Sequence, residues 1–201
     1  MPESRDELSE SSSNEASRAF RDEAWPLLPS LLRVARMLTH DEHSAEDLVQ
    51  ETMMRAFRHI GSFQPGTNMK AWLMTILRRT HVDLYRRASR SVEAGSLDAL
   101  AFEPAGGQAA SEEVVWPEPE AILERFDDET IESALRELPE PMRWVLLLVD
   151  VEQLSIEEAA KTLEVAPGTV KSRASRARAR LREHLQPLAI QRGWVRSEAG
   201  G

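Results

Sequence analysis

The sequence predicts an all-α protein made of two small helical domains joined by a flexible acidic linker. Apolar residues recur at helical spacing on both sides of residues 89–126, where Ser, Gly, Ala, Pro and Glu dominate. From Glu93 to Glu140, fourteen acidic residues accompany only two arginines, so the linker should repel other acidic polymers. The expected divisions are a disordered segment 1–17, a first domain 18–88, the linker 89–126, a second domain 127–187 and a tail 188–201.

Composition excludes several classes of protein. The chain has 201 residues, a net charge of −9 and no cysteine, which excludes disulfides, thiolate catalysis and Cys-ligated metals. No run of 18 apolar residues predicts a membrane span. The first 17 residues are polar and acidic, without the apolar core of a signal peptide, so we expect a cytoplasmic protein.

Two helices are expected to open the first domain. Residues 19–39 have a helical pattern in which Pro26 and Pro29 should delay or kink the helix. Ser44 is the expected N-cap of the next helix. Its inward side chains are predicted to be Ala45, Leu48, Val49, Met53, Ala56, Phe57 and Ile60.

The first two turns of this second helix are acidic. They contain Glu46, Asp47, Gln50 and Glu51, largely on the faces that do not point inward. Acidic residues near a helix N-terminus are also favourable to the helix dipole, which is a purely structural explanation for them.

A loop and a basic helix complete the first domain. Pro-Gly and Asn predict a loop over Phe63–Asn68, and a helix follows from Met69 to Ala88. Lys70, Arg78 and Arg79 make that helix basic. A loop bounded by Phe63 and Trp72 beside such a helix is typical of single-stranded base capture, with core packing of the two aromatic rings as the alternative.

The second domain should contain a helix over 127–138, an apolar helix after Pro141 and a helix-turn-helix from Ser155 to Leu185. Ser155 and Glu158 form a capping box for a short helix, and Pro167 opens the next one. One apolar stripe on that last helix is formed by Val170, Ala174, Ala177, Leu181 and Leu185.

The last helix reverses the charge of the chain. Between residues 167 and 185 it has six lysines and arginines and one glutamate. Ser172 and Arg176 point away from the apolar stripe, and Thr169, Lys171 and Arg173 flank them. A solvated face or a peptide for an acidic partner could look similar, but the local reversal in an acidic chain favours DNA binding.

The sequence gives little support for an enzyme. His40 and His43 flank Asp41 and Glu42 and could bind a metal, but a solvated loop is the expected interpretation. No Gly-rich phosphate loop or nucleophile elbow is visible. We therefore expect no catalytic residue, no metal and no cofactor.

Two longer runs resemble a known family. SAEDLVQETMMRAFRHIGSFQPGTNMKAWLMTILRRTHVDLYRR resembles region 2 of the sigma-70 family, and LRELPEPMRWVLLLVDVEQLSIEEAAKTLEVAPGTVKSRASRARARL resembles its region 4. With these two regions and a linker alone, the chain resembles the extracytoplasmic-function (ECF, group IV) sigma factors. A dimeric helix-turn-helix regulator is the competing hypothesis, but it leaves the acidic helix and the PGTN loop without a role.

The resemblance implies a transcription initiation factor and assigns roles to residues. It implies that Glu46, Asp47, Gln50 and Glu51 dock on the β′ clamp helices of core RNA polymerase, and that region 4 meets the β flap. Recognition of the −10 promoter element would fall to Phe63, Thr67, Asn68, Lys70, Arg78 and Arg79. Recognition of the −35 element would fall to Thr169, Lys171, Ser172, Arg173 and Arg176. An anti-sigma factor is the expected inhibitor.

Overall fold

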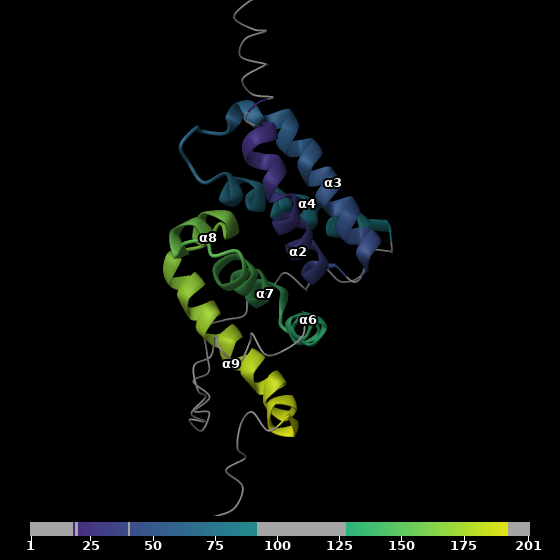
Figure 1. Cartoon of the computed structure of the whole chain (residues 1–201), viewed down its shortest axis with the longest axis vertical. Coiled ribbons are helices and arrows are strands. Elements are labelled where there is room, and N and C mark those ends of the chain that lie inside the picture. Colours follow the sequence, from purple (N-terminus) through teal and green to yellow (C-terminus); the bar gives the residue numbers. More distant parts are fainter. Residues whose placement is uncertain (1–17, 19, 40, 92–127, 193–201) are drawn as a thin grey trace, which may run out of the picture.

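The computed structural model describes residues 18, 20–39, 41–91 and 128–192, and within these ranges every regular element is helical. The segment 1–17, the linker except for its first three residues, and the tail from residue 193 lie outside the described residues. Figure 1 shows the helices of the first domain packed above those of the second. The predicted all-α class is confirmed by this architecture.

The first domain is a small bundle of three main helices. Its elements are η1 (Phe20–Ala24), η2 (Trp25–Leu27), α2 (Leu28–Leu38), α3 (Glu42–His59), η3 (Ile60–Ser62) and α4 (Met69–Ser91). The expected effect of Pro26 and Pro29 is confirmed, because a π turn and a 3-10 turn precede the regular helix α2. Helix α4 extends to Ser91, three residues into the expected linker.

The predicted N-cap of α3 is wrong. The backbone N–H of Ser44 donates to Asp41 Oδ1 at 2.8 Å, and its hydroxyl donates to Asp41 Oδ2 at 2.7 Å. Asp41 is therefore the cap, and the helix begins at Glu42. Aspartate caps a helix as well as serine does. The carboxylate of Asp41 can accept a hydrogen bond from the backbone N–H of Ser44, three residues further along the chain. These two hydrogen bonds lower the pKa of the Asp41 carboxyl.

The predicted inward face of α3 is confirmed at most positions and wrong at Phe57. Ala45, Leu48 and Ala56 are buried, whereas Phe57 is 52% exposed. Its ring meets the edge of Phe20 at a centroid distance of 5.2 Å. Phe57 follows Ala56 directly, about 100° round the helix, so it lies at the margin of the buried stripe.

The second domain contains α6 (Asp128–Arg136), α7 (Glu140–Leu146), η4 (Leu147–Val151), α8 (Ile156–Leu163) and α9 (Pro167–Gln191). The capping box is confirmed: the N–H of Glu158 donates to Ser155 Oγ at 3.2 Å, and the N–H of Ser155 donates to Glu158 Oε2 at 2.8 Å. Glu164 ends α8 in the left-handed conformation, at φ 56°.

Helix α9 confirms the predicted stripe and is longer than predicted. Val170, Ala174, Ala177, Leu181 and Leu185 are all buried. The helix continues through Pro187 to Gln191, so nothing in the backbone separates a tail at residue 188. Ala189, fully buried, extends the stripe by one more turn, and this burial offsets the helix-breaking tendency of Pro187.

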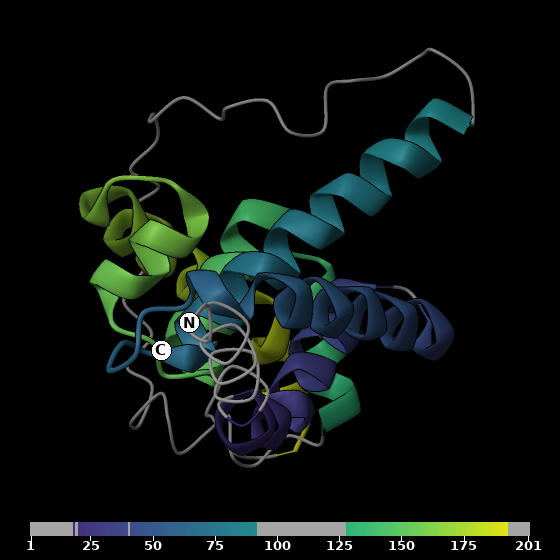
Figure 2. The same cartoon turned by 90° about the horizontal axis from the view of Figure 1, so that it is seen from above.

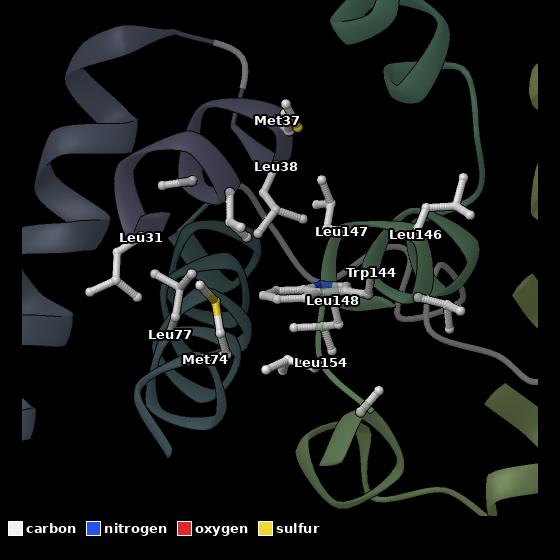
Figure 3. Close-up of a cluster of buried hydrophobic side chains, with 14 of the residues drawn as sticks. Leu31, Met37, Leu38, Met74, Leu77, Trp144, Leu146, Leu147, Leu148 and Leu154 are labelled. Carbon is white, nitrogen blue, oxygen red and sulfur yellow. The ribbon is translucent and has the colours of Figure 1, made fainter. Parts of the chain in front are cut away.

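The two domains share one hydrophobic cluster. Leu38 of α2 and Met74 and Leu77 of α4 lie opposite Trp144, Leu147 and Leu148 of α7 and η4 (Figure 3). Leu77, Leu147 and Leu148 have no exposed surface. The sequence did not predict this contact, and it places the second domain against the basic helix α4, as the view from above shows (Figure 2).

Replacing Ser155, the N-cap of α8, tests how much this cap contributes to the stability of the fold. Ser155→Ala should lower the free energy of unfolding by about 1 kcal/mol, because the N–H of Glu158 loses its acceptor. The measurement is urea unfolding followed by circular dichroism. Ser175→Ala, at an exposed site within α9, is the control and should change stability by less than about 0.5 kcal/mol. Equal effects of the two substitutions would contradict the capping role.

Candidate nucleic-acid interface

The exposed side of α9 is positioned by its buried stripe. Lys171, Ser172 and Arg176 are exposed, and Thr169 and Arg173 are half-buried. The Ser172 hydroxyl donates to the carbonyl of Thr169 at 3.1 Å, and Arg176 Nε donates to the carbonyl of Ser172 at 3.4 Å. Among the described residues no carboxylate pairs with Lys171, Arg173 or Arg176. The five predicted residues therefore share one surface with unpaired positive charge, the form of a helix that enters a DNA groove.

One arginine of the same helix has a structural role instead. Arg178 Nε and an Nη donate to the two carboxylate oxygens of Asp150 at 2.9 and 2.6 Å. This bidentate pair joins α9 to η4 and fixes the orientation of the recognition surface.

The loop before α4 is a tight turn. The backbone N–H and the hydroxyl of Thr67 both donate to the carbonyl of Gln64, at 3.1 and 2.7 Å. Gly66 has φ +85° and follows Pro65, which is the arrangement of a type II turn. Asn68 Oδ1 accepts from the N–H of Ala71 at 3.3 Å and so caps α4. Thr67 and Asn68 are exposed in this hydrogen-bonded loop.

Phe63 lies beneath this loop rather than on its surface. Only 8% of it is exposed, and its ring packs on Trp72 at a centroid distance of 5.5 Å. The expectation of an exposed Phe63 is wrong. The alternative of core packing describes the pair, because the turn at Pro65 and Gly66 folds the chain back over the ring.

The predicted residues of α4 contact the second domain. Lys70 Nζ lies 3.3 Å from Glu152 Oε2 and donates to the carbonyl of Glu152 at 3.1 Å. Arg79 pairs with Glu164 at 2.9 Å. Asn68 Nδ2 donates to Glu158 Oε1 at 2.7 Å. Arg78 is half-buried, and its charge helps to lower the pKa of Glu164.

These contacts perturb the carboxyl groups of the second domain. The Arg79 guanidinium lowers the pKa of Glu164. The pKa of Glu158 is lowered by hydrogen bonds from the backbone and side chain of Ser155, and further by Asn68. His81 of α4, whose Nδ1 lies 3.4 Å from Glu140 Oε1, lowers the pKa of Glu140.

A second candidate surface is an apolar groove that runs along α3 from Glu46 to Phe57. Trp25, Met54 and Phe57 line it and are 59%, 41% and 52% exposed. Glu46 and Gln50 border the same groove, and Asp47 is exposed next to them. Arg21 of η1 also lines the groove, so the acidic margin belongs to α3 alone. An apolar groove whose α3 margin is acidic suits an amphipathic helix that carries basic residues.

Glu51 differs from the other three residues predicted on this face. It is half-buried and accepts from Arg55 Nε at 2.8 Å, while an Nη of Arg55 donates to Asp83 at 2.7 Å. Both carboxylates raise the pKa of Arg55, with Asp83 the stronger cause. Arg55 therefore joins α3 to α4, and Glu51 holds Arg55 from within the same helix. The expectation that Glu51 is freely exposed is wrong.

The described residues contain no group of three or more potential ligands that could hold a metal ion. Asp41 caps α3, Glu42 pairs with Arg36 at 2.6 Å, and His43 lies 3.7 Å from Asp47. His40 lies outside the described residues.

The fold and the two surfaces define a two-domain DNA-binding protein with a helix-turn-helix in its second domain. Comparisons with known proteins give the family. Residues 26–91 match Sigma-70 region 2, and residues 128–181 match Sigma-70, region 4. The chain is 40% identical over 164 residues to the ECF RNA polymerase sigma factor EcfG of Rhodopseudomonas palustris, with 81% of this chain and 83% of the relative aligned.

Solved structures agree with this result. The sigma factor RpoE of Bartonella quintana, in complex with the anti-sigma factor NepR, shares 35% identity and a TM-score of 0.66, covering 84% of this chain and 98% of that one. CnrH, in complex with the cytosolic domain of CnrY, shares 26% identity and a TM-score of 0.59, covering 87% and 95%.

The chain belongs to the ECF RNA polymerase sigma factors of the sigma-70 family. Proteins of this family bind core RNA polymerase and direct transcription initiation at promoters, and they are not enzymes. The acidic helix and the PGTN loop both lie within the residues that match Sigma-70 region 2. The competing hypothesis of a dimeric helix-turn-helix regulator does not account for these two features. Within the described ranges, no helix is long and apolar enough to cross a membrane.

The lowered pKa values predict the direction of a pH effect. Glu140, Glu158 and Glu164 stabilise the folded chain fully above the ordinary pKa of glutamate, about 4.3, and lose this contribution as the pH falls through their lower folded values. The thermal unfolding midpoint should therefore fall between pH 6 and pH 3.5. Scanning calorimetry of the wild type and Glu140→Gln measures it, and the variant should lose less over this range. An equal loss in the variant would show that Glu140 does not contribute.

Proposed function

We propose that α9 reads the −35 promoter element through Thr169, Lys171, Ser172, Arg173 and Arg176. The observation that carries this proposal is a surface of α9, away from its buried apolar stripe, on which Lys171, Arg173 and Arg176 have no carboxylate partner among the described residues and two hydroxyl side chains lie beside them. The stripe fixes the orientation of the helix, so the polar side chains enter a major groove together. Arginine and lysine supply phosphate contacts and bidentate contacts to guanine.

The −10 element is assigned to the loop and the start of α4, through Thr67, Asn68, Lys70, Arg78 and Arg79. An exposed, hydrogen-bonded turn packed over buried Phe63 and half-buried Trp72, beside three cations, suits a single strand held by its backbone and an extruded base. Phe63 is assigned a supporting role, because its buried ring offers no open stacking face.

Core RNA polymerase is assigned to the groove and the acidic margin of α3. Glu46, Asp47 and Gln50 would meet the β′ clamp helices, with Glu51 holding α3 in place through Arg55. Region 4 would contact the β flap. We further propose that the chain acts in the cytoplasm and that an anti-sigma factor controls it. One structural neighbour is a sigma factor in complex with an anti-sigma factor, and another, CnrH, is in complex with the cytosolic domain of CnrY.

Run-off transcription with purified core polymerase and a genomic promoter library tests the proposal as a whole. Transcripts that start at new sites only when the protein is added would support it. Failure to bind core polymerase, or transcription unchanged by the protein, would reject it.

The −35 assignment predicts a local loss of affinity. Arg176→Ala should weaken binding to a −35 duplex from a promoter found in that assay, by about 1–3 kcal/mol if Arg176 reads a base bidentately. Fluorescence anisotropy over a salt series measures the effect. Arg58→Ala, which removes an exposed cation from α3, is the control and should leave the affinity unchanged. Unchanged binding by Arg176→Ala at every salt concentration would contradict the assignment.

The polymerase assignment predicts a loss that does not involve the fold. Glu46→Arg with Gln50→Arg should abolish binding to core polymerase, because two exposed side chains of the acidic margin become cationic. Competition against a labelled sigma factor for core polymerase measures it. Glu157→Arg, on the exposed side of α8, is the matched control and should still compete. If the double variant folds and competes equally well, the docking surface lies elsewhere.

A further inference from the structure

Five polar contacts between the two domains have the same direction. A cation, a histidine or an amide comes from the first domain, and a carboxylate comes from the second. The pairs are Arg33 and Lys70 with Glu152, Arg79 with Glu164, His81 with Glu140, and Asn68 with Glu158. Neutral hydrogen bonds accompany them, from the hydroxyl of Thr75 to that of Thr162 and from Thr162 to the carbonyl of Ala71. The second domain therefore presents a row of carboxylates to the basic helix α4, in the manner of a phosphate backbone.

Glu152 is the innermost of these carboxylates. Its side chain is 1% exposed, with Lys70 Nζ at 3.3 Å and Arg33 Nε at 3.4 Å. A buried carboxylate is tolerated only with partners of opposite charge. Both partners belong to the other domain, so Glu152 can remain buried only while the domains are closed. It stabilises the closed form specifically and contributes nothing of this kind once the domains separate.

The backbone conformation of Glu164 also indicates a side chain that stabilises the closed form. It occupies the left-handed region at φ 56°, at the C-cap of α8, where glycine is the favoured residue. Its carboxylate pairs with Arg79 at 2.9 Å. A side chain at this position is unfavourable for the turn, and the ion pair with Arg79 that it gains crosses the domain boundary.

We propose that Glu152, Glu158 and Glu164 form a latch that occupies Lys70, Asn68 and Arg79 in place of promoter DNA, so that the free chain is closed to the −10 strand. This inference rests on the proposed assignment of those three residues to the −10 element. It does not extend to α9, whose recognition surface stays exposed in the closed form. The closed chain can therefore bind a −35 duplex while its −10 surface is covered.

The latch acts together with the shared hydrophobic cluster. Opening exposes side chains such as Leu77, Leu147 and Leu148, which have no exposed surface in the closed form. DNA that competes for Lys70 and Arg79 must therefore also offset the free energy that is lost when these apolar side chains become exposed to water. If the open form is about 10% of the chains, the apparent affinity for the −10 strand is about tenfold below that of the open form. A partner that separates the domains removes this factor.

A cysteine pair can lock the closed form reversibly. Thr75 Oγ1 of α4 and Thr162 Oγ1 of α8 lie 3.2 Å apart, and the chain has no cysteine of its own. Thr75→Cys with Thr162→Cys should therefore form one disulfide across the domains in the free full-length chain under mild oxidation. Thr75→Cys with Glu157→Cys, where Glu157 lies on the exposed side of the same helix, is the matched control and should not cross-link.

The oxidised and reduced forms of the Thr75/Thr162 variant are then compared on three readouts. These are binding of the −35 duplex, binding of the non-template −10 strand, and run-off transcription from the same promoter with core polymerase. The oxidised form should keep its affinity for the duplex, bind the −10 strand at least about tenfold more weakly, and fail to initiate, with dithiothreitol restoring both losses. Failure of the pair to cross-link, or equal strand binding and transcription by both forms, would overturn the latch.

Carboxylate variants identify which contacts hold the latch. Glu152→Gln and Glu164→Gly should each raise the affinity of the free chain for the −10 strand, without changing its affinity for the −35 duplex. Glu164→Gly also relieves the left-handed turn, so a loss of folding cannot explain its effect. Glu157→Gln is the control. Unchanged strand binding by both variants would overturn the latch. If the wild-type chain, which has threonine at positions 75 and 162, does not initiate transcription either, the proposed function itself is wrong. The yield of the cross-link does not affect this result, so the two failures can be told apart.

Discussion

The segment from Met142 to Leu148 must be covered on most of its sides. Arg143 is its one polar residue, and a helix that is apolar on nearly every face is stable only inside a protein. Trp144 and Val145 to Leu148 are buried, by α9 on one flank and by α2 and α4 on the other. This requirement holds the helix-turn-helix together, and it also explains why the second domain lies against the first.

Closing the domains around this segment divides the basic residues of the chain into two groups. Those on α9 remain in solvent, because the stripe from Val170 to Leu185 faces inward. Those at the start of α4 lie over the second domain, where carboxylates balance them. The same acidic protein thus has one open and one occupied cationic surface, although both surfaces have a similar composition.

The features that the sequence predicted well are those set by residues close together in the chain. The α9 stripe, the capping box at Ser155 and the turn at Pro65 and Gly66 depend on local periodicity, caps and backbone preferences. The cap of α3 was missed because Asp41 and Ser44 are both good caps, and only the geometry decides between them. Phe57 was wrongly predicted to be buried because it lies only one residue, or about 100° of rotation, from buried Ala56.

What could not be predicted depends on contacts between distant segments. Glu51 looks like any acidic residue on an outer helical face until Asp83 of α4 is placed beside its partner Arg55. The burial of Glu152 depends on Lys70 and Arg33, both more than 80 residues away in the chain, so no local pattern signals it. The continuation of α9 beyond Pro187 likewise depends on the burial of Ala189.

Asn68 shows what this arrangement means for the evolution of promoter choice. It caps α4, lies in the proposed −10 surface and donates to Glu158. A mutation there that alters base preference would also change helix stability and the closure of the free protein. Promoter selectivity at this position therefore cannot drift independently of basal activity, and a lineage that acquires a new −10 preference through Asn68 must restore the resting state by a compensating change at another site.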